Sequence, residues 1–98
     1  MGVLMRTDII VHDPQDDVGV VVVDSISFQQ AAEVWVVDDG RRYQLTAKDR
    51  IPLGHKVALR DFQVGDQITK YGHDIGKVIS GIKKGDHVHV HNVKTKRW

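Results

Sequence analysis

The chain has 98 residues, of which 41% are hydrophobic and 28% charged. These proportions are typical of a folded protein, and the length suits a single domain with one hydrophobic core. Fourteen basic and 13 acidic residues leave a net charge of +1 with the histidines neutral. This balance gives no support for a protein that binds nucleic acid.

Cysteine is absent, which excludes disulfides, thiolate nucleophiles and zinc sites that contain cysteine. The sequence has no apolar run of ~18 residues and no secretory signal pattern, so we expect no membrane association. We therefore expect a cytoplasmic protein.

Strand patterns begin near the amino terminus. Residues 8–12 form a short segment rich in β-branched side chains, which predicts a strand. Residues 13–17 contain aspartates and a proline, which indicates a loop. Residues 18–23 are almost uninterrupted valine, which favours a strand buried on both faces. Ser27 is a candidate N-cap for one helical turn that runs through Ala32.

The middle of the chain contains the clearest hairpin pattern. Residues 33–37 and 41–45 are strand-like and are joined by Asp38-Asp39-Gly40, whose Asp-Gly pair suits a tight hairpin turn. Residues 51–54 predict a turn in which Pro52 fixes φ and Gly54 takes a left-handed conformation. Residues 55–59 alternate between polar and apolar, which predicts a half-exposed strand.

One short pattern occurs twice in the second half. Residues 62–68 and 82–88 share an apolar residue, two spacers, Gly-Asp, a polar residue and an apolar residue, and residues 51–57 are a looser third copy. Each copy predicts a tight turn with a left-handed glycine that leads into a strand. The patterns together predict a mostly β fold of many short strands and tight turns.

Histidines occupy every second position from residue 87 to residue 91. In a strand, His87, His89 and His91 share one face with Cα atoms ~6.5–7 Å apart. Two of the three, with a ligand from elsewhere, can bind one metal ion, and a solvent-facing polar strand explains the pattern equally well. His55 and His73 each follow a turn glycine and could approach the same region.

Two further groups carry cationic side chains. Lys70 and Tyr71 can bind an anionic oxygen or transfer a proton, and the following Gly72 permits close backbone approach, although an ordinary hairpin also explains this segment. Lys56 and Arg60 can contact a carboxylate, but Arg60 could equally form a surface pair with the aspartate that follows it. No group of residues makes a complete active site by itself.

Three segments together resemble the amino-terminal module of the altronate and galactarate dehydratase family. Residues 51–61, 70–76 and 85–92 match the patterns I-P-x-G-H-K-x-A, I-x-K-Y-G-x-x-I-G and G-x-x-V-H-V-H-N in order and at natural spacing. The match extends from about residue 11 to residue 94. It implies an SAF-type domain with a β-clip fold over residues 8–94, with terminal tails at 1–7 and 95–98.

The resemblance also implies a function. In this family the module either precedes a large dehydratase domain in the same chain or forms a separate small subunit beside it. The enzymes act on sugar acids such as altronate and galactarate, or on sulfolactate. We therefore expect a small lyase subunit, inactive alone, that completes the active site of a large partner in a sugar-acid dehydratase. The alternatives are the small subunit of a sulfolactate sulfo-lyase, a non-catalytic sugar-acid-binding module, and a subunit that only stabilises its partner.

The site residues follow from the positions that match the family patterns. The resemblance implies catalytic roles for Lys70, His89 and His91, and metal binding by His89 and His91 to Fe2+ or a similar divalent ion shared with the large subunit. It implies substrate binding by five residues, namely His55, Lys56, Tyr71, Gly72 and Asn92. His87 and His73 fill variable positions and are left out, and a homo-oligomer is also compatible with the family.

Overall fold

The structure, a computed structural model, describes residues 6–95 and consists of short β-strands joined by turns. Within this range there is no helix, and therefore no helix long and apolar enough to cross a membrane. The predicted mostly β fold is confirmed. Of the predicted tails, residues 1–5 and 96–98 lie outside the described part of the chain.

The largest sheet has six strands in the order β10-β7-β2-β1-β4-β5. Only the β1–β4 pair is parallel, and the other neighbours are antiparallel. Strand β2 lies between β1 and β7 and is mostly buried, as expected, but it ends at Val21, and Val22 is 39% exposed. The six strands are β1 (Ile9–Val11), β2 (Val18–Val21), β4 (Ala31–Val36), β5 (Arg42–Thr46), β7 (Lys56–Ala58) and β10 (His87–Val88).

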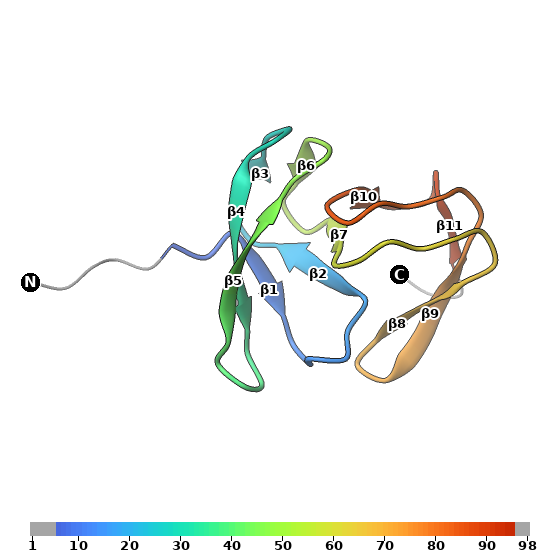
Figure 1. Ribbon diagram of the computed structural model, residues 1–98, viewed down its shortest axis with the longest axis horizontal. Coiled ribbons are helices and arrows are strands. Elements are labelled where there is room, and N and C mark those ends of the chain that lie inside the picture. Colours follow the sequence, from blue (N-terminus) through green and yellow to red (C-terminus); the bar gives the residue numbers. More distant parts are fainter. Residues whose placement is uncertain (1–5, 96–98) are drawn as a thin grey trace, which may run out of the picture.

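Two smaller sheets complete the fold. An antiparallel three-stranded sheet has the order β11-β9-β8, and a strand pair joins β3 to β6. Figure 1 shows β8, β9 and β11 at one end of the molecule, β1, β4 and β5 at the other, and β7 and β10 between them. The strands of the smaller sheets are β3 (Ser25–Ile26), β6 (Ile51–Pro52), β8 (Gln67–Lys70), β9 (His73–Val78) and β11 (Val93–Thr95).

Each end of the molecule has its own hydrophobic cluster. The first cluster packs side chains of β1, β4 and β5, among them Ile9, Val34 and Leu45. The second packs residues near β8, β9 and β11, among them Ile68 and Val78. Strand β7 contributes Val57 to the first cluster and Ala58 to the second, and β10 contributes Val88 to the second. Side chains on these two strands are therefore held where the two clusters meet.

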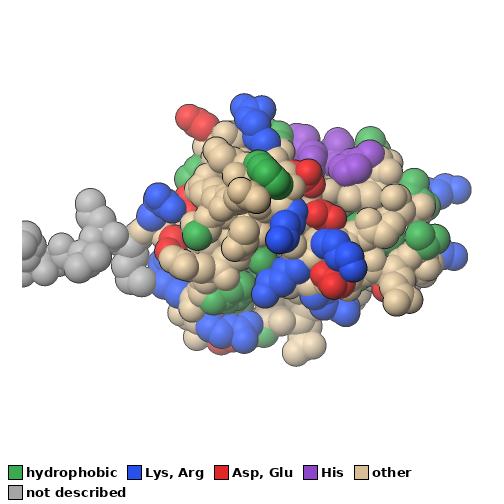
Figure 2. Space-filling model, turned by 45° about the horizontal axis from the view of Figure 1, so that its top comes forward, with side chains coloured by type: hydrophobic (Ala, Val, Ile, Leu, Met, Phe, Trp, Pro, Cys, Tyr) green, Lys and Arg blue, Asp and Glu red, His purple; other side chains and the backbone are tan. Residues whose placement is uncertain are grey.

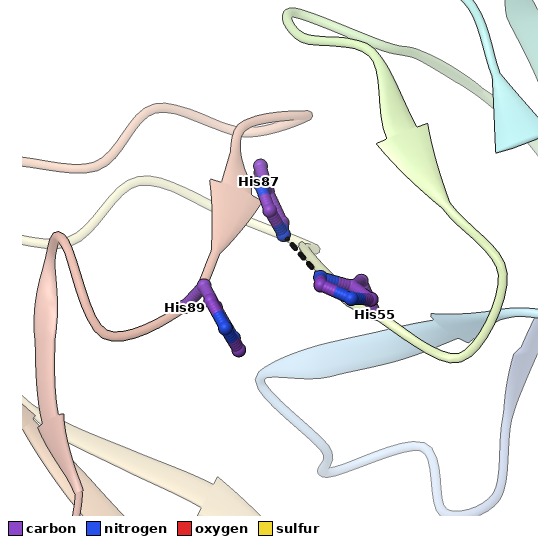
Figure 3. A group of neighbouring side chains, drawn as sticks. All are labelled: His55, His87 and His89. Atoms are coloured by element: carbon purple, nitrogen blue, oxygen red, sulfur yellow. Dashed lines mark hydrogen bonds between the residues drawn. The ribbon is translucent and has the colours of Figure 1, made fainter.

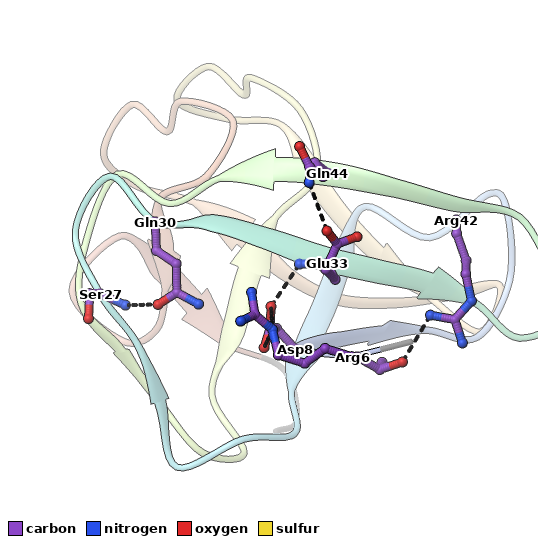
Figure 4. Close-up of polar contacts among 8 residues, drawn as sticks. Arg6, Asp8, Ser27, Gln30, Glu33, Arg42 and Gln44 are labelled. Atoms are coloured by element: carbon purple, nitrogen blue, oxygen red, sulfur yellow. Dashed lines mark hydrogen bonds and ion pairs between the residues drawn. The ribbon is translucent and has the colours of Figure 1, made fainter. Parts of the chain in front are cut away.

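The predicted hairpin is confirmed, but the helical turn is wrong. Gly40 has φ +74° in the turn between β4 and β5. Residues 27–30 form a turn in which Gln30 N–H donates to the Ser27 carbonyl oxygen (3.0 Å) and Ser27 N–H donates to Gln30 Oε1 (2.9 Å; Figure 4). Ala31 then begins β4 by pairing with Thr46, so sheet formation outweighs the local helix preference.

The predicted repeat has the same structure in both copies. Gly65 in residues 62–68 and Gly85 in residues 82–88 have φ of +96° and +93°. In each copy the aspartate after the glycine accepts a backbone N–H from three residues earlier at 2.8 Å. The second copy leads directly into β10, and this turn therefore sets where the first histidine of that strand lies.

Candidate functional site

Three histidines meet at the junction of the two ends of the fold, and we call His55, His87 and His89 the histidine cluster (Figure 3). One ring nitrogen of each residue lies within 4.8 Å of those of the other two. His55 Nδ1 and His87 Nε2 are 2.8 Å apart and share a hydrogen bond, so one of these rings accepts as a neutral imidazole. All three side chains are half-buried.

The cluster is built by a strand pair and a tight turn. Antiparallel β7 and β10 place His87 opposite Val57. Gly54, with φ +81°, ends the turn before β7, and His55 N–H donates to the carbonyl oxygen of Pro52 (3.1 Å) in the same turn. His87 N–H donates to Asp49 Oδ2 at 2.9 Å. Residues 32 positions apart in the chain are thereby held in contact.

The expectation of three histidines on one strand is wrong. Strand β10 ends at Val88, and the chain then turns, with Asn92 N–H donating to the His89 carbonyl oxygen (3.1 Å). Buried Asn92 holds this turn with its side chain, because Nδ2 donates to the His87 carbonyl oxygen (2.8 Å) and Oδ1 accepts His89 N–H (3.0 Å). His91 is exposed, with its ring centroid 5.4 Å from that of His87.

His87, which the family pattern leaves out of the site residues, lies beside the other two rings in the structure. This residue contacts the other two members of the cluster, whereas the ring of His91 lies at its margin. His55, which the sequence suggested could approach these histidines and which the resemblance assigns to substrate binding, is part of the cluster. The metal-binding roles expected for His89 and His91 stay predictions.

The surroundings of His87 and His89 favour their neutral imidazole forms. The pKa of His87 is lowered to about 4, mainly by burial and then by the nearby charges of His55, His91 and His89, while the Asp49 carboxylate raises it. Burial and the charges of neighbouring histidines and Lys56 also lower the pKa of His89. Neutral imidazoles have a free lone pair, which is the form that binds metals.

The donor set of the cluster fits a divalent transition metal. Imidazole nitrogen is a common ligand of Zn, Fe, Ni and Cu ions. Bonds of ~2.0–2.1 Å hold two ligand nitrogens about 3.0–3.4 Å apart, so small rotations of the three rings would bring their nitrogens to binding distance. Three protein ligands leave positions for a substrate or for a group from a partner chain.

Two lysines extend the site beyond the histidines. Burial, followed by the positive charge of Lys70, lowers the pKa of Lys56, which adjoins the cluster in sequence. Burial also lowers the pKa of Lys70, while the Asp16 carboxylate raises it. The charge of Lys56 in turn lowers the pKa of His89. Lys56 therefore lies within electrostatic reach of Lys70 and of His89.

The turn between β8 and β9 is strained and firmly anchored. Tyr71 (φ +54°) and Gly72 (φ +72°) are consecutive left-handed residues, and for tyrosine this conformation costs of order 1–3 kcal/mol. Tyr71 N–H donates to buried Asp16 Oδ1 (2.8 Å), and its ring packs against His12 at 4.6 Å between centroids. Lys70 Nζ lies 4.2 Å from the centre of the same ring.

A second buried carboxylate fixes the strand that precedes this turn. Asp17 Oδ2 accepts Thr69 N–H (2.7 Å), and Asp17 Oδ1 accepts two hydrogen bonds from Arg60 (2.6 and 3.0 Å). Arg60 therefore pairs with Asp17, and the surface pair with Asp61 considered from the sequence is not what the structure shows. Sequence reasoning missed the roles of Asp16 and Asp17, because Arg60, Thr69 and Tyr71 lie more than 40 residues away from them.

The expected substrate-binding residues thus fall into two neighbouring groups. His55 and Lys56 lie at the histidine cluster, while Tyr71 and Gly72 lie in the β8–β9 turn. Beside this turn is a surface depression of about 440 Å³, which is lined by Lys70, Tyr71, His73, Asp74 and Ile75. The amide of Asn92 is engaged by backbone groups and so positions the turn that carries His89.

The comparisons with known proteins point to one family. Residues 7–96 match the altronate/galactarate dehydratase SAF domain. The (2R)-sulfolactate sulfo-lyase subunit alpha of Chromohalobacter salexigens is 51% identical over 94 residues, which cover 96% of this chain and 100% of that relative. The subunit of the same name from Paracoccus pantotrophus is 52% identical over 63 residues, 64% of this chain and 94% of the relative.

A second kind of relative is much longer than this chain. The altronate dehydratase of Bacillus subtilis is 47% identical over 51 residues, which cover 52% of this chain but 10% of that relative. The segment resemblance, the β fold and the match over nearly the whole length agree with one another. The chain belongs to the altronate/galactarate dehydratase SAF-domain family.

Proposed function

We propose that this chain is the small, alpha-type subunit of a lyase that acts on a 2-hydroxy acid, with sulfite elimination from (2R)-sulfolactate as the first candidate reaction. The observation that carries the proposal is the 51% identity with the Chromohalobacter salexigens subunit, which the match covers completely. A sugar-acid dehydratase is the second candidate, because altronate dehydratase is related at the level of the shared domain.

The chemistry explains why a cationic site with histidines is useful. To eliminate sulfite, a base removes the proton from the carbon that bears the hydroxyl group, and the neighbouring carbon–sulfur bond breaks. Sulfite leaves with the bonding electrons, and the resulting enol rearranges to a 2-oxo acid. Negative charge accumulates on the carboxylate as the proton is removed, so nearby positive charges lower the barrier.

Lys56 and Lys70 are our candidates for contacts with the anionic substrate. Each lies partly buried, and each has a lowered pKa, which also favours proton transfer. We assign Lys70 to catalysis, and we assign Lys56, Tyr71 and Gly72 to substrate binding beside the depression at the β8–β9 turn. The sulfonate and carboxylate groups of sulfolactate give the two lysines one anionic partner each.

We assign the histidine cluster to a divalent transition metal, Fe2+ or a similar ion, shared with the large subunit. His89 is the member that both the family pattern and the cluster geometry support. When bound, such an ion would polarise an oxygen atom of the substrate. His91 lies at the edge of the cluster, where it can approach a ligand or the partner. Asn92 holds in place the turn that carries His89 and His91.

Reconstitution with both candidate substrates tests the proposal. The chain is co-expressed with the large subunit of the same organism, and the complex is assayed with (2R)-sulfolactate for sulfite and with altronate for the dehydrated 2-oxo acid. Sulfite release supports the first candidate, and altronate dehydration supports the second. Turnover of neither substrate, with direct binding of sugar acids to the isolated chain, would replace the lyase proposal by a non-catalytic binding module.

A lysine variant tests the assignment of the cationic site. Lys70→Met should lower kcat/KM by at least about 100-fold, because a group that transfers a proton contributes roughly 10²–10⁴. Lys48→Met removes an exposed lysine from another part of the chain and serves as the matched control. Equal activity of the two variants would show that Lys70 has no part in the reaction.

A further inference from the structure

Three exposed aliphatic side chains are brought together at the end of the fold that holds the three-stranded sheet. Val64, Ile79 and Val90 are 67%, 50% and 59% exposed, and we call them the apolar strip. The residue after Val64 donates its N–H to the carbonyl oxygen of the residue before Ile79 (2.8 Å), and Ile79 N–H donates to the Asn92 carbonyl oxygen (2.9 Å). Backbone pairing therefore connects the three segments.

The apolar strip borders the proposed site. Val90 lies in the turn that joins His89 to Asn92, so it adjoins the histidine cluster. Figure 2 shows hydrophobic side chains beside the histidines and along the adjoining end of the molecule. A large chain that contributes groups to the histidine cluster would approach across this strip.

A pair of lysines lies on the same part of the surface. Lys77 and Lys94 are directly opposite in the register of β9 and β11, and both are exposed. Like charges in this arrangement destabilise a sheet, and among residues 6–95 neither lysine has an ion-pair partner. Ile79 follows Lys77 by two residues and is also exposed, as expected for side chains on one face.

We propose that the apolar strip and the Lys77–Lys94 pair form the docking surface for the large subunit of the enzyme. This inference rests on the proposed function. The partner face would combine aliphatic side chains, which cover the strip, with carboxylates, which neutralise the two facing lysines. Two points select this partner: the strip adjoins the histidine cluster, which a large subunit completes under the proposed function, and the relatives that match over most of their own length are named as alpha subunits.

The experiment measures the affinity of the two subunits. Purified large subunit from the same organism is titrated with the chain and with the variants Val64→Asp, Ile79→Asp and Lys77→Glu, and the complex is followed by sedimentation. Each variant should raise Kd by about 10- to 100-fold, as expected for residues at the centre of an interface. For the wild-type chain, Kd should also rise with salt concentration, because the lysine contacts are screened.

Matched controls come from the other end of the molecule. Phe28 and Val37 are 62% and 42% exposed, similar to the strip, and Phe28→Asp and Val37→Asp should leave Kd unchanged. Circular dichroism of every variant confirms that its fold is intact. Unchanged Kd for the strip variants would overturn the docking surface, and so would wild-type dimers of this chain that Ile79→Asp converts to monomers.

Activity measurements separate this inference from the proposed function. If the strip variants weaken a complex that has no lyase activity, the docking surface stands and the proposed function falls. If an active complex forms with the same Kd for wild-type and strip variants, the proposed function stands and the docking surface falls. If wild-type chain and large subunit form no complex, both fall.

Discussion

Protonation of His87 should make the stability of the chain depend on pH. The pKa of this residue is lowered from 6.5 to about 4 in the folded chain, mainly by burial and then by neighbouring histidines. Between these two values the unfolded chain binds a proton that the folded chain does not bind. The free energy of unfolding therefore decreases as the pH falls from about 6.5 to about 4, and this contribution is level below that range.

The size of the effect follows from the same two values. The difference between 6.5 and 4 corresponds to ~3.4 kcal/mol at ~1.36 kcal/mol per pKa unit. His87 is only partly buried, and solvent screening reduces this to about 1–2 kcal/mol. The lowered pKa of His89 acts in the same direction.

Urea unfolding at pH 7 and pH 4.5, with a chelator present, measures this contribution. The wild-type chain should lose about 1–2 kcal/mol more than His87→Gln between the two pH values, because glutamine does not titrate. His73→Gln removes an exposed histidine outside the cluster and should behave as the wild type does. Parallel pH profiles for wild type and His87→Gln would refute the environment that we describe for this residue.

Three further predictions concern the fold and the metal site. In thermal unfolding, Gly85→Ala should lower the free energy of unfolding by about 3 kcal/mol or more, because the added Cβ would collide with a backbone carbonyl oxygen of β5. Gly65→Ala, at a glycine with a similar φ and open space around it, should lower it by about 1–2 kcal/mol. Asp17→Ala should lower the free energy of unfolding by about 2–4 kcal/mol, because it breaks a partly buried ion pair and leaves a backbone N–H without its acceptor. A variant as stable as the wild type would contradict this prediction. By calorimetry with Zn2+, His87→Ala should weaken binding by about 10-fold or more and His91→Ala by less than about 3-fold; the reverse order would favour the pair His89 and His91 as the ligands.

Local turn chemistry made much of the fold predictable. Asp38-Asp39-Gly40 was sufficient to identify the β4–β5 hairpin, since few residues other than glycine adopt the required positive φ. The repeated Gly-Asp pattern identified two equivalent turns. In each turn the glycine adopts a positive φ, and the aspartate accepts a backbone N–H from three residues earlier. These features depend on residues within a few positions of one another, so sequence alone carries them.

Contacts between distant residues were not predictable in the same way. The segment after Ser27 has residues that suit a helix, and only pairing with β5 makes it a turn and a strand. The histidine cluster needs His55 beside His87, and strand order, not spacing, brings them together. The period of two from residue 87 fails because the side chain of Asn92 bonds to the backbone and ends the strand.

The most direct test of our central claim is sulfite release by the complex when the chain carries His89→Ala. The assay uses (2R)-sulfolactate and saturating amounts of the chain, and Kd of the two subunits is measured beside it. If the histidine cluster belongs to the active site of a lyase, kcat falls by at least about 100-fold while Kd stays at the wild-type value. Wild-type kcat with His89→Ala fully bound would contradict the claim.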